Sequence, residues 1–222
     1  MHKVIEPKIL YFGTPVVLIS TRNVDGSANL APMSSAWWLN QSCMLGMSAR
    51  SQTVENLLRE GEGVLNLPSA DLVGAVDRLA LTTGRDPVPD YKEAIGYRYE
   101  RDKFGLAGLT PLAADLVKAP LVAECPLQLE ARVELVHDFD AQDSSIRAIE
   151  MRILRVHIDE RLLVPGTRNY IDPEKWQPLI MNFCEFFGLS GKIHPSRLES
   201  AFYGLPRKAE MQAIGATDCS TK

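Results

Sequence analysis

The sequence predicts a mainly β protein with some α content: an antiparallel β-barrel or curved sheet with helices packed outside it. The order of expected elements, strands followed by helices and then strands again, favours this class over a parallel doubly wound sheet. Residues 127–135 alternate strictly between apolar and polar side chains, as in a strand with one solvated face. The Asp25-Gly26 pair between the first two strand-like runs indicates the hairpin turn that an antiparallel meander requires.

Local composition places the elements of the first half of the chain. The first apolar run is rich in β-branched residues and predicts a strand. An apolar stripe at Val54, Leu57 and Leu58 predicts a helix that Ser51 or Thr53 caps at its start. The expected elements are strands over 15–21, 29–39, 44–48 and 64–67, a helix that ends before Gly61, and a second helix over 71–83.

The second half combines a long irregular segment, a strand pair and a helix. Residues 84–110 are rich in glycine and proline, and a loop of that length in a compact domain usually serves function or wraps a neighbour. Residues 149–158 are the expected antiparallel partner of 127–135. Asp172-Pro173 is a favourable helix start, and apolar residues at helical spacing follow it as far as Phe187.

Length and composition define the class of protein. With 222 residues and 45% hydrophobic content, the chain can bury one substantial core. No repeat or linker divides it, so we expect a single domain over residues 1–222 with a C-terminal helical extension at about 172–200. The net charge of -4 argues against nucleic acid as a partner, since phosphate backbones require a clustered basic surface. No run approaches the roughly 20 apolar residues that span a bilayer.

Standard sequence signals for metals and nucleotides are absent. The four cysteines, Cys43, Cys125, Cys184 and Cys219, are scattered, and the four histidines show no metal-ligand spacing. The first three cysteines lie among apolar neighbours, so we expect buried, reduced thiols and a cytoplasmic location. The sequence contains no G-x-G-x-x-G, P-loop or G-x-S-x-G motif. We therefore expect no metal and identify no catalytic residue.

Small polar residues interrupt the second expected strand. The segment 29–38 contains Met33, Ser34, Ser35 and Ala36, whose small side chains would let the backbone approach a flat ligand closely. A flavin ring needs such a surface, with apolar cover for its faces and polar groups for its edge. The alternative interpretation is a bulged strand that only contributes to the core.

A second polar segment lies at the junction between the third strand and the first helix. Ser48, Arg50, Ser51 and Thr53 gather there with the free N–H groups of a helix start, which favour anions. A guanidinium can hold phosphate through two N–H groups. The alternative interpretation is plain helix capping beside a surface arginine.

Taken in order, these segments resemble the flavin reductase-like, FMN-binding split-barrel family over residues 7–196. The residues that carry the resemblance are Ala31-Pro32-Met33-Ser34-Ser35, Ser48-Ala49-Arg50-Ser51-Gln52-Thr53 with Asn56, Val64-Leu65-Asn66-Leu67-Pro68, Asp102-Lys103-Phe104, Gly108-Leu109-Thr110, Ala119-Pro120 and Glu124-Cys125-Pro126. Each motif is weak singly, whereas the ordered series is more specific.

The resemblance implies a Greek-key-like split β-barrel with peripheral helices, assembled as a homodimer with FMN near the subunit interface. The residues that it places near the flavin ring are Met33, Ser34, Ser35 and Ala36. Those that it places near the phosphate are Ser48, Arg50, Ser51, Thr53 and Asn56. It also implies that Lys103 and Phe104 reach the flavin of the partner subunit.

The chain departs from the family pattern in one loop. Many NAD(P)H-dependent members carry a Gly-Asp-His segment between the last two barrel strands, where this chain has neither Gly nor His in residues 141–147. We therefore keep three hypotheses open. The first is an FMN-dependent NAD(P)H:flavin oxidoreductase that supplies reduced flavin or electrons to a monooxygenase or redox protein. The others are a flavoredoxin-like FMN electron carrier and a non-enzymatic flavin-binding module. The barrel also resembles oxidases of pyridoxine-like phosphates, but the motifs do not.

The phosphate assignment makes a direct prediction for Arg50. Arg50→Ala should weaken FMN binding by about 1.5–3 kcal/mol, the range for hydrogen bonds to charged groups. Titration of the purified variant with FMN measures this loss. An unchanged affinity would mean that Arg50 does not contact the phosphate.

Overall fold

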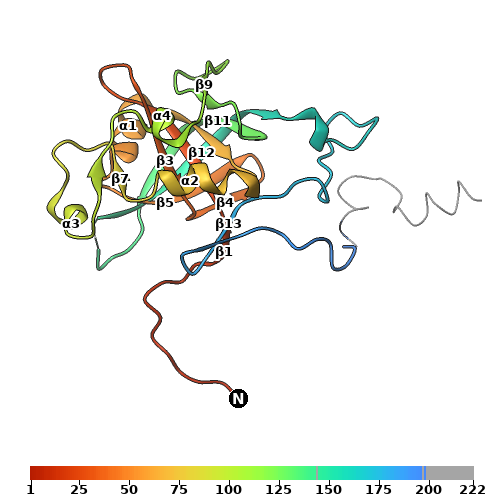
Figure 1. The fold of residues 1–222 in the computed structure, drawn as a ribbon, viewed down its shortest axis with the longest axis horizontal. Helices are drawn as coiled ribbons and strands as arrows, with labels where there is room; N and C mark the ends of the chain where they lie inside the picture. Colours follow the sequence, from red (N-terminus) through yellow and green to blue (C-terminus); the bar gives the residue numbers. More distant parts are fainter. Residues whose placement is uncertain (144, 197, 199–222) are drawn as a thin grey trace, which may run out of the picture.

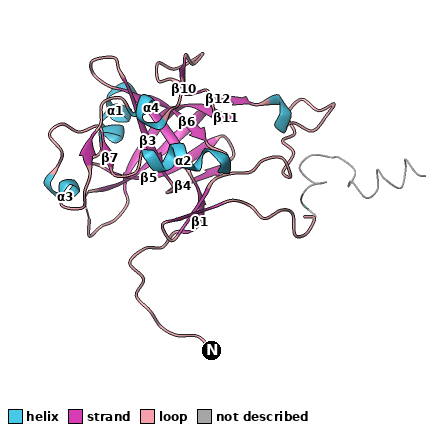
Figure 2. Ribbon diagram, viewed as in Figure 1, coloured by secondary structure: helices cyan, strands magenta, loops and turns pink. Residues whose placement is uncertain are grey.

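The computed structural model describes residues 1–143, 145–196 and 198. A seven-stranded antiparallel sheet forms its centre, with strand order β3-β2-β6-β11-β12-β5-β4. Figures 1 and 2 show the strands crossing in the middle of the body, with the helices around them. The bounds are Val17–Arg22 for β2, Ala28–Met33 for β3, Ala36–Leu39 for β4, Ser42–Ser48 for β5, Glu62–Leu67 for β6, Leu127–Asp138 for β11 and Ile146–Ile158 for β12.

Smaller elements surround this sheet. One further sheet combines β1 (Phe12–Pro15), β13 (Ile180–Asn182) and β14 (Glu185–Phe187). Two-stranded pairs join β9 (Pro111–Leu112) to β10 (Leu121–Val122) and β7 (Thr82–Thr83) to β8 (Arg98–Tyr99), the latter in parallel. The helices are α1 (Gln52–Glu60), α2 (Val73–Arg78), α3 (Asp90–Glu93) and α4 (Lys103–Ala107), with 3₁₀ turns η1 (Ala70–Leu72) and η2 (Glu160–Leu162).

Side chains from one face of the main sheet converge on a single core. Alternate residues of β11 and β12, such as Leu129 and Met151, meet residues of β2, β5 and β6 there. Helix α1 adds Val54 and Leu57, both fully buried. The opposite face of β2 and β3 packs against α2 and α4 in a second core. The sheet is therefore curved around one core and covered by helices on its outside, which confirms the predicted class.

The pairing of β11 with β12 confirms the predicted antiparallel pair and extends it. The register runs from Leu127 opposite Ile158 to Asp138 opposite Arg147. Two register shifts interrupt it, after Glu130 and after Val133. Such bulges increase the local twist of a strand pair, which helps the sheet to curve.

The predicted strand over 29–39 is two strands. The chain leaves β3 at Met33 and enters β4 at Ala36, so Ser34 and Ser35 form the break between them. Residues of β3 pair with β2, whereas the carbonyl of Ser35 already accepts from the N–H of Gly46 in β5 at 2.8 Å. The break carries the chain from one edge of the sheet to the other.

The predicted helix over 71–83 ends early. After η1 and α2, Leu81 adopts a left-handed backbone conformation with φ 54. The hydroxyl of Thr82 then donates to the carbonyl of Leu79 at 2.7 Å and terminates the helical turn. The segment 84–110, expected to be irregular, contains α3, β8 and α4.

The predicted C-terminal helix from Asp172 is wrong for the described residues. Pro178 falls in the middle of the apolar stripe, where it lacks the N–H that a helix needs. Leu179 instead bonds to both neighbouring segments: its N–H donates to Pro68 at 3.1 Å and its carbonyl accepts from Val16 at 2.8 Å. The β13–β14 hairpin follows. The last residues of the expected extension, 197, 199 and 200, lie outside the described part.

The turn of that hairpin also corrects the prediction for one cysteine. Phe183 and Cys184 both have positive φ, 47 and 67, as a two-residue hairpin turn of this type requires. Cys184 is consequently exposed, whereas Cys43 and Cys125 are buried as predicted. Burial raises the pKa of the Cys43 thiol to about 12, so it stays protonated.

A buried carboxylate fastens the loop between β9 and β10 to the sheet. Glu130 is fully buried and accepts from the backbone N–H groups of Asp115, Leu116 and Val117 at 3.2, 2.6 and 3.0 Å. Nε2 of His157 lies 2.6 Å from the same carboxylate. Burial would raise the pKa of Glu130, but the hydrogen bonds from His157 and from these N–H groups outweigh it and lower the pKa. Both oxygens of the Glu130 carboxylate therefore already have hydrogen-bond partners.

This arrangement predicts a stability effect. Glu130→Gln should lower the free energy of unfolding by about 1.5–3 kcal/mol, because hydrogen bonds to a charged acceptor are lost. The folded-state pKa is depressed, so the contribution is present above the unfolded pKa and is lost as pH falls through the folded value. Urea unfolding at neutral and acidic pH measures both effects. Glu134→Gln, an exposed site on the same strand, is the control and should change little.

Candidate functional site

A pocket of about 340 Å³ lies between the sheet and the segment that follows α2. One wall comes from the end of β3, the end of β5 and the first turn of α1. The other wall comes from residues 79–84 and from side chains of the segment that includes α3. The lining residues are Ala31, Pro32, Met33, Met47, Ser48, Ser51, Gln52, Thr53, Leu79, Ala80, Leu81, Thr82, Thr83, Gly84, Tyr91, Lys92, Ile95, Tyr97 and Lys103.

Helix α1 directs its N-terminus at this pocket. Ser51 is the N-cap, and its hydroxyl accepts from the N–H of Val54 at 3.2 Å. The N–H groups of Gln52 and Thr53 precede the first helical hydrogen bonds and have no partner within the helix. Free donors and the positive end of the helix dipole therefore face the cavity, an arrangement that favours an anion.

Lys103 places a buried ammonium group in the same pocket. Its side chain is 4% exposed and forms no ion pair or hydrogen bond with any described residue. Burial and then the nearby Lys92 ammonium lower the pKa of Lys103 to about 8, against a smaller opposing effect of Glu100. A buried charge without a partner is costly, so this group favours a ligand that brings negative charge.

Lys92 adds a second positive charge. Its ammonium lies 3.5 Å from the hydroxyl of Thr83 and 5.1 Å from the ring centre of Tyr97. Burial and then Arg85 lower the pKa of Lys92 below its usual value. No Asp or Glu belongs to the lining described above, so the pocket is basic overall.

The structure brings together four of the residues that the sequence predicts for the site. Met33 and Ser48 line the pocket from the ends of β3 and β5, and Ser51 and Thr53 line it from α1. Met33 also packs against the main core and offers an apolar surface. The hydroxyl of Thr53 accepts from Asn29 at 3.1 Å, so its position is fixed by the sheet.

Other predicted residues lie near the pocket but outside its lining. Ser34 and Ala36 are buried, and the Ser35 hydroxyl is 3.4 Å from that of Tyr11. The amide of Asn56 is fully buried and donates to Thr21 and Asn23 at 3.0 and 2.8 Å. Asn56 therefore ties α1 to the sheet in the described conformation.

Arg50 lies at the rim. Its guanidinium carbon is 5.7 Å from the ring centre of Tyr91, within cation–π range. Its carbonyl accepts from Nε of Arg85 at 3.1 Å. The contact of Arg50 with an anion stays a prediction.

Sequence reasoning missed most of the wall formed by residues 79–97. Lys92, Tyr97 and Gly84 follow no motif, and only the length of the loop indicated a functional role. Lys103 lines the pocket of its own chain, and the expectation that it reaches the flavin of a partner subunit stays a prediction. Phe104, expected beside it, is buried in the core under α2 and α4.

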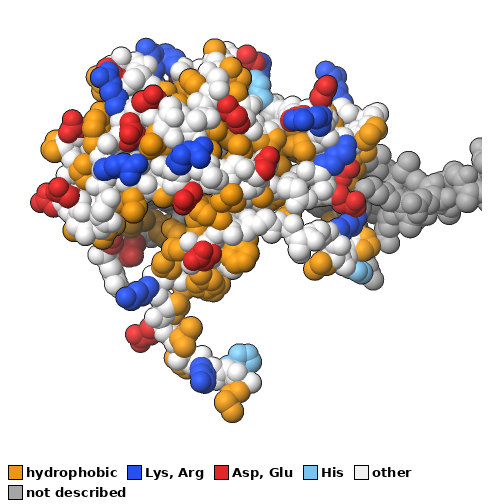
Figure 3. All heavy atoms as spheres, in the orientation of Figure 1, with side chains coloured by type: hydrophobic (Ala, Val, Ile, Leu, Met, Phe, Trp, Pro, Cys, Tyr) orange, Lys and Arg blue, Asp and Glu red, His pale blue; other side chains and the backbone are white. Residues whose placement is uncertain are grey.

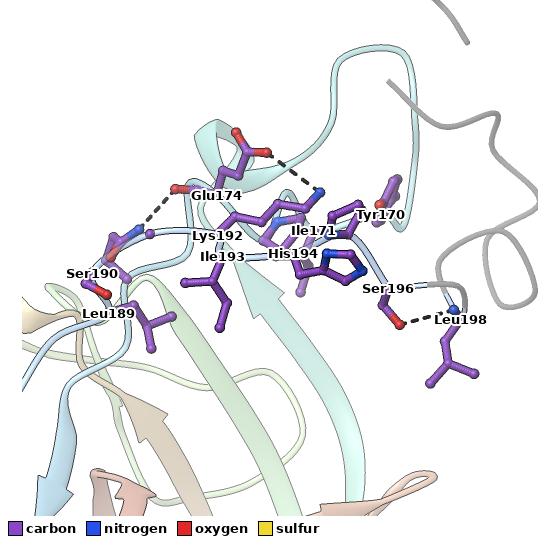
Figure 4. Close-up of a pocket in the computed structure, with 14 residues that line it drawn as sticks. Tyr170, Ile171, Glu174, Leu189, Ser190, Lys192, Ile193, His194, Ser196 and Leu198 are labelled. Atoms are coloured by element: carbon purple, nitrogen blue, oxygen red, sulfur yellow. Dashed lines mark hydrogen bonds and ion pairs between the residues drawn. The ribbon is translucent and has the colours of Figure 1, made fainter. Parts of the chain in front are cut away.

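A larger hollow of about 1290 Å³ lies elsewhere, between residues 170–177 and 189–198. Figure 4 shows its side chains on extended segments, with Lys192 reaching across to Glu174 at 3.9 Å. Most of the lining is exposed, and Ile193 is 95% exposed. This hollow contains no buried charged group, so we place the candidate site at the smaller pocket.

Comparison with known proteins identifies the class. The model of the flavin reductase like domain matches residues 9–173. The uncharacterized protein YdfE of Bacillus subtilis (strain 168) is 39% identical over 191 residues, which cover 86% of this chain and 91% of that protein. The chain belongs to the flavin reductase-like family, whose members bind a flavin and carry out oxidoreductase chemistry.

Solved structures agree on the fold. Flavoredoxin of Desulfovibrio vulgaris (Miyazaki F) superimposes with a TM-score of 0.72 at 21% identity and covers 90% of this chain and 100% of its own. Nitrilotriacetate monooxygenase component B from Bacillus cereus gives 0.67 at 20% identity, covering 83% and 88%. These likenesses confirm the predicted split-barrel architecture. Within the described residues, no helix is long and apolar enough to cross a membrane.

The pKa of Lys103 predicts a pH dependence of anion binding. An anion favours the charged lysine, so the affinity for FMN should be highest between the second pKa of its phosphate, at about 6, and the pKa of Lys103, at about 8, and should fall as pH rises through and beyond 8. Flavin fluorescence titrations on both sides of pH 8 measure this trend. Lys103→Met should bind FMN more weakly and show a flatter profile over the same interval. A wild-type profile that matches that of Lys103→Met would contradict the assignment.

Proposed function

We propose that this chain binds FMN in the pocket between α1 and residues 79–103 and acts as an NAD(P)H-dependent flavin oxidoreductase. The observation that carries the proposal is Lys103, a largely buried residue whose ammonium pairs with no other described residue, in a pocket that α1 faces with its free N–H groups. A phosphate monoester carries the charge and the acceptors that these groups need. A volume of about 340 Å³ falls within the usual range for small-ligand sites.

The remaining walls suit an aromatic ring system. Pro32, Met33 and Met47 supply apolar surface on the sheet side, and Tyr97 and Ile95 supply it on the other. In this proposal, Ser48, Ser51 and Thr53 hold the phosphate with Lys103, and Arg50 joins them from the turn before α1. Ser34, Ser35 and Ala36 would lie near the ring edge, and Asn56 would act on the phosphate only by holding α1.

The flavin, when bound, supplies the hydride or electron transfer, so no protein nucleophile is needed. The chain's own residues orient the cofactor, keep water from one side of it and balance its charge. Lys103 and Lys92 favour the more negative state of a bound ligand, because both ammonium groups lie in a pocket without lining carboxylates.

A flavoredoxin-like electron carrier is the second candidate. The loop between β11 and β12 lacks the Gly and His of NAD(P)H-dependent relatives. At the end of this loop, the carbonyl of Ser145 accepts a hydrogen bond from the N–H of Ala49 at 2.7 Å. The likeness to flavoredoxin also favours this candidate. A non-enzymatic flavin-binding module is the remaining hypothesis.

A homodimer accords with the surface. Phe12, Trp37, Leu39 and Phe183 are exposed on β1, β4 and the β13–β14 turn, and the rings of Phe12 and Phe183 meet edge to face at 5.1 Å. Figure 3 shows apolar side chains gathered on the lower part of the body, where the N-terminal segment leaves it. An exposed apolar cluster of this kind supports contact with a second copy of the chain.

Two further expectations belong to this proposal. The likeness to a monooxygenase component B supports a partner monooxygenase that receives reduced flavin. The protonated thiols of Cys43 and Cys125 accord with a cytoplasmic location.

The test begins with the visible spectrum of freshly purified protein and its titration with FMN. We expect FMN to bind with a dissociation constant in the micromolar range or lower. Riboflavin should bind at least about tenfold more weakly, because it lacks the phosphate. Failure to bind both FMN and FAD would contradict the proposal.

Anaerobic addition of NADH or NADPH then separates the candidates. Steady turnover with added FMN supports the reductase. Retention of yellow colour through gel filtration, without turnover from either donor, supports the carrier. A bound flavin that stays oxidised with every physiological donor supports the non-enzymatic module.

A further inference from the structure

The segment from Gly84 to Tyr99 covers the end of the pocket where α1 begins. It leaves the body at β7 and returns at β8, and these two strands pair directly, with Thr82 opposite Arg98 and Thr83 opposite Tyr99. Figure 1 shows α3 at the outer end of this excursion, on the same side of the body as β7 and α1. We call residues 84–91 the roof.

The roof touches the first turn of α1 at close range. A Cβ on Gly84 would lie 3.1 Å from Cγ of Gln52 and 2.8 Å from Oδ1 of Asn29, so only glycine allows this approach. Gln52 lies in the first turn of α1, and Asn29 donates to the hydroxyl of Thr53 in the same turn. The backbone at Gly84 therefore lies directly over the helix start.

The side chains of Arg85 and Tyr91 then hold the roof in place. Arg85 bridges to Glu55 of α1 at 2.6 Å and donates to the carbonyl of Arg50 at 3.1 Å. Tyr91 stacks its ring against the guanidinium of Arg50, 5.7 Å from the ring centre. Arg50 and Glu55 flank the first turn of α1, so these contacts hold the roof against the helix start.

We infer that the roof restricts this site to a flavin mononucleotide and excludes the adenylate of FAD. The inference rests on the proposed function, in which the phosphate lies at the start of α1. A terminal phosphate ends under the roof, but a pyrophosphate must continue outward. Its path crosses the contacts of Gly84 with Gln52, Arg85 with Glu55 and Tyr91 with Arg50.

The test compares dissociation constants of FMN, FAD and riboflavin for the wild type and for an Arg85→Ala, Tyr91→Ala double variant. The wild type should prefer FMN to FAD by about tenfold or more, and the double variant should lose most of that preference by gaining FAD affinity. Riboflavin, which lacks the phosphate, reports separately on the ring part of the pocket, because Tyr91 also lines the pocket. Glu55→Gln should change the FMN-to-FAD ratio in the same direction by a smaller factor.

Arg101→Ala is the matched control. Arg101 forms an exposed ion pair with Asp25 at 3.0 Å and follows the same segment, but it does not line the pocket. Its FMN-to-FAD ratio should equal that of the wild type.

The outcomes separate the two proposals. Binding of FMN and FAD with equal affinity by the wild type would overturn the roof inference and leave the flavin proposal intact. An undiminished preference for FMN in the double variant would do the same. Failure of every flavin to bind would overturn the proposed function, and the roof inference with it.

Discussion

The candidate site depends on a buried network of amides and hydroxyls that fixes α1 to the sheet. Asn29 donates to Thr21 and Thr53 at 3.2 and 3.1 Å, and Asn56 donates to Thr21 at 3.0 Å. These groups have almost no contact with water, so breaking one bond leaves a buried polar atom unsatisfied. The network holds the start of the helix in one position, and the pocket, the lysines and the roof are all arranged around that position.

The lysine charge of the pocket comes from α4, not from the N-terminus of α1. Lys103 is the first residue of α4, and Asp102 caps that helix by accepting from the N–H of Gly105 at 2.8 Å. Phe104 packs in the second core and holds α4 there. Packing of the helix therefore forces the lysine into a site where water cannot fully solvate its charge. A ligand that carries negative charge would offset the cost of this poorly solvated ammonium.

Much of the sheet and part of the site follow from the sequence. Strict alternation over 127–135 and the Asp25-Gly26 turn identified strands correctly, because each signal depends on near neighbours alone. The hydroxyls of Ser48, Ser51 and Thr53 were found for the same reason. Lys92 and Gly84 were not, since Lys92 is placed by Thr83 and Tyr97 and Gly84 by Gln52 of α1, contacts that a loop sequence does not encode. The C-terminal helix failed because an apolar stripe outweighed Pro178, and the pairing of β13 with β1 depends on residues more than 160 positions away.

The parallel pairing of β7 with β8 gives the covering segment fixed ends. Thr82 and Thr83 are buried, and they tie the departure and the return of the chain to one another. The pairing of β7 with β8 fixes both ends of the segment relative to each other and to the barrel, independently of the conformation of the residues between them. Changes in this stretch beyond Gly84, whose approach to Asn29 requires glycine, can therefore reshape the entrance while β7 and β8 keep their pairing. Within this architecture, ligand preference can diverge in that stretch while the scaffold beneath it is conserved by its own packing.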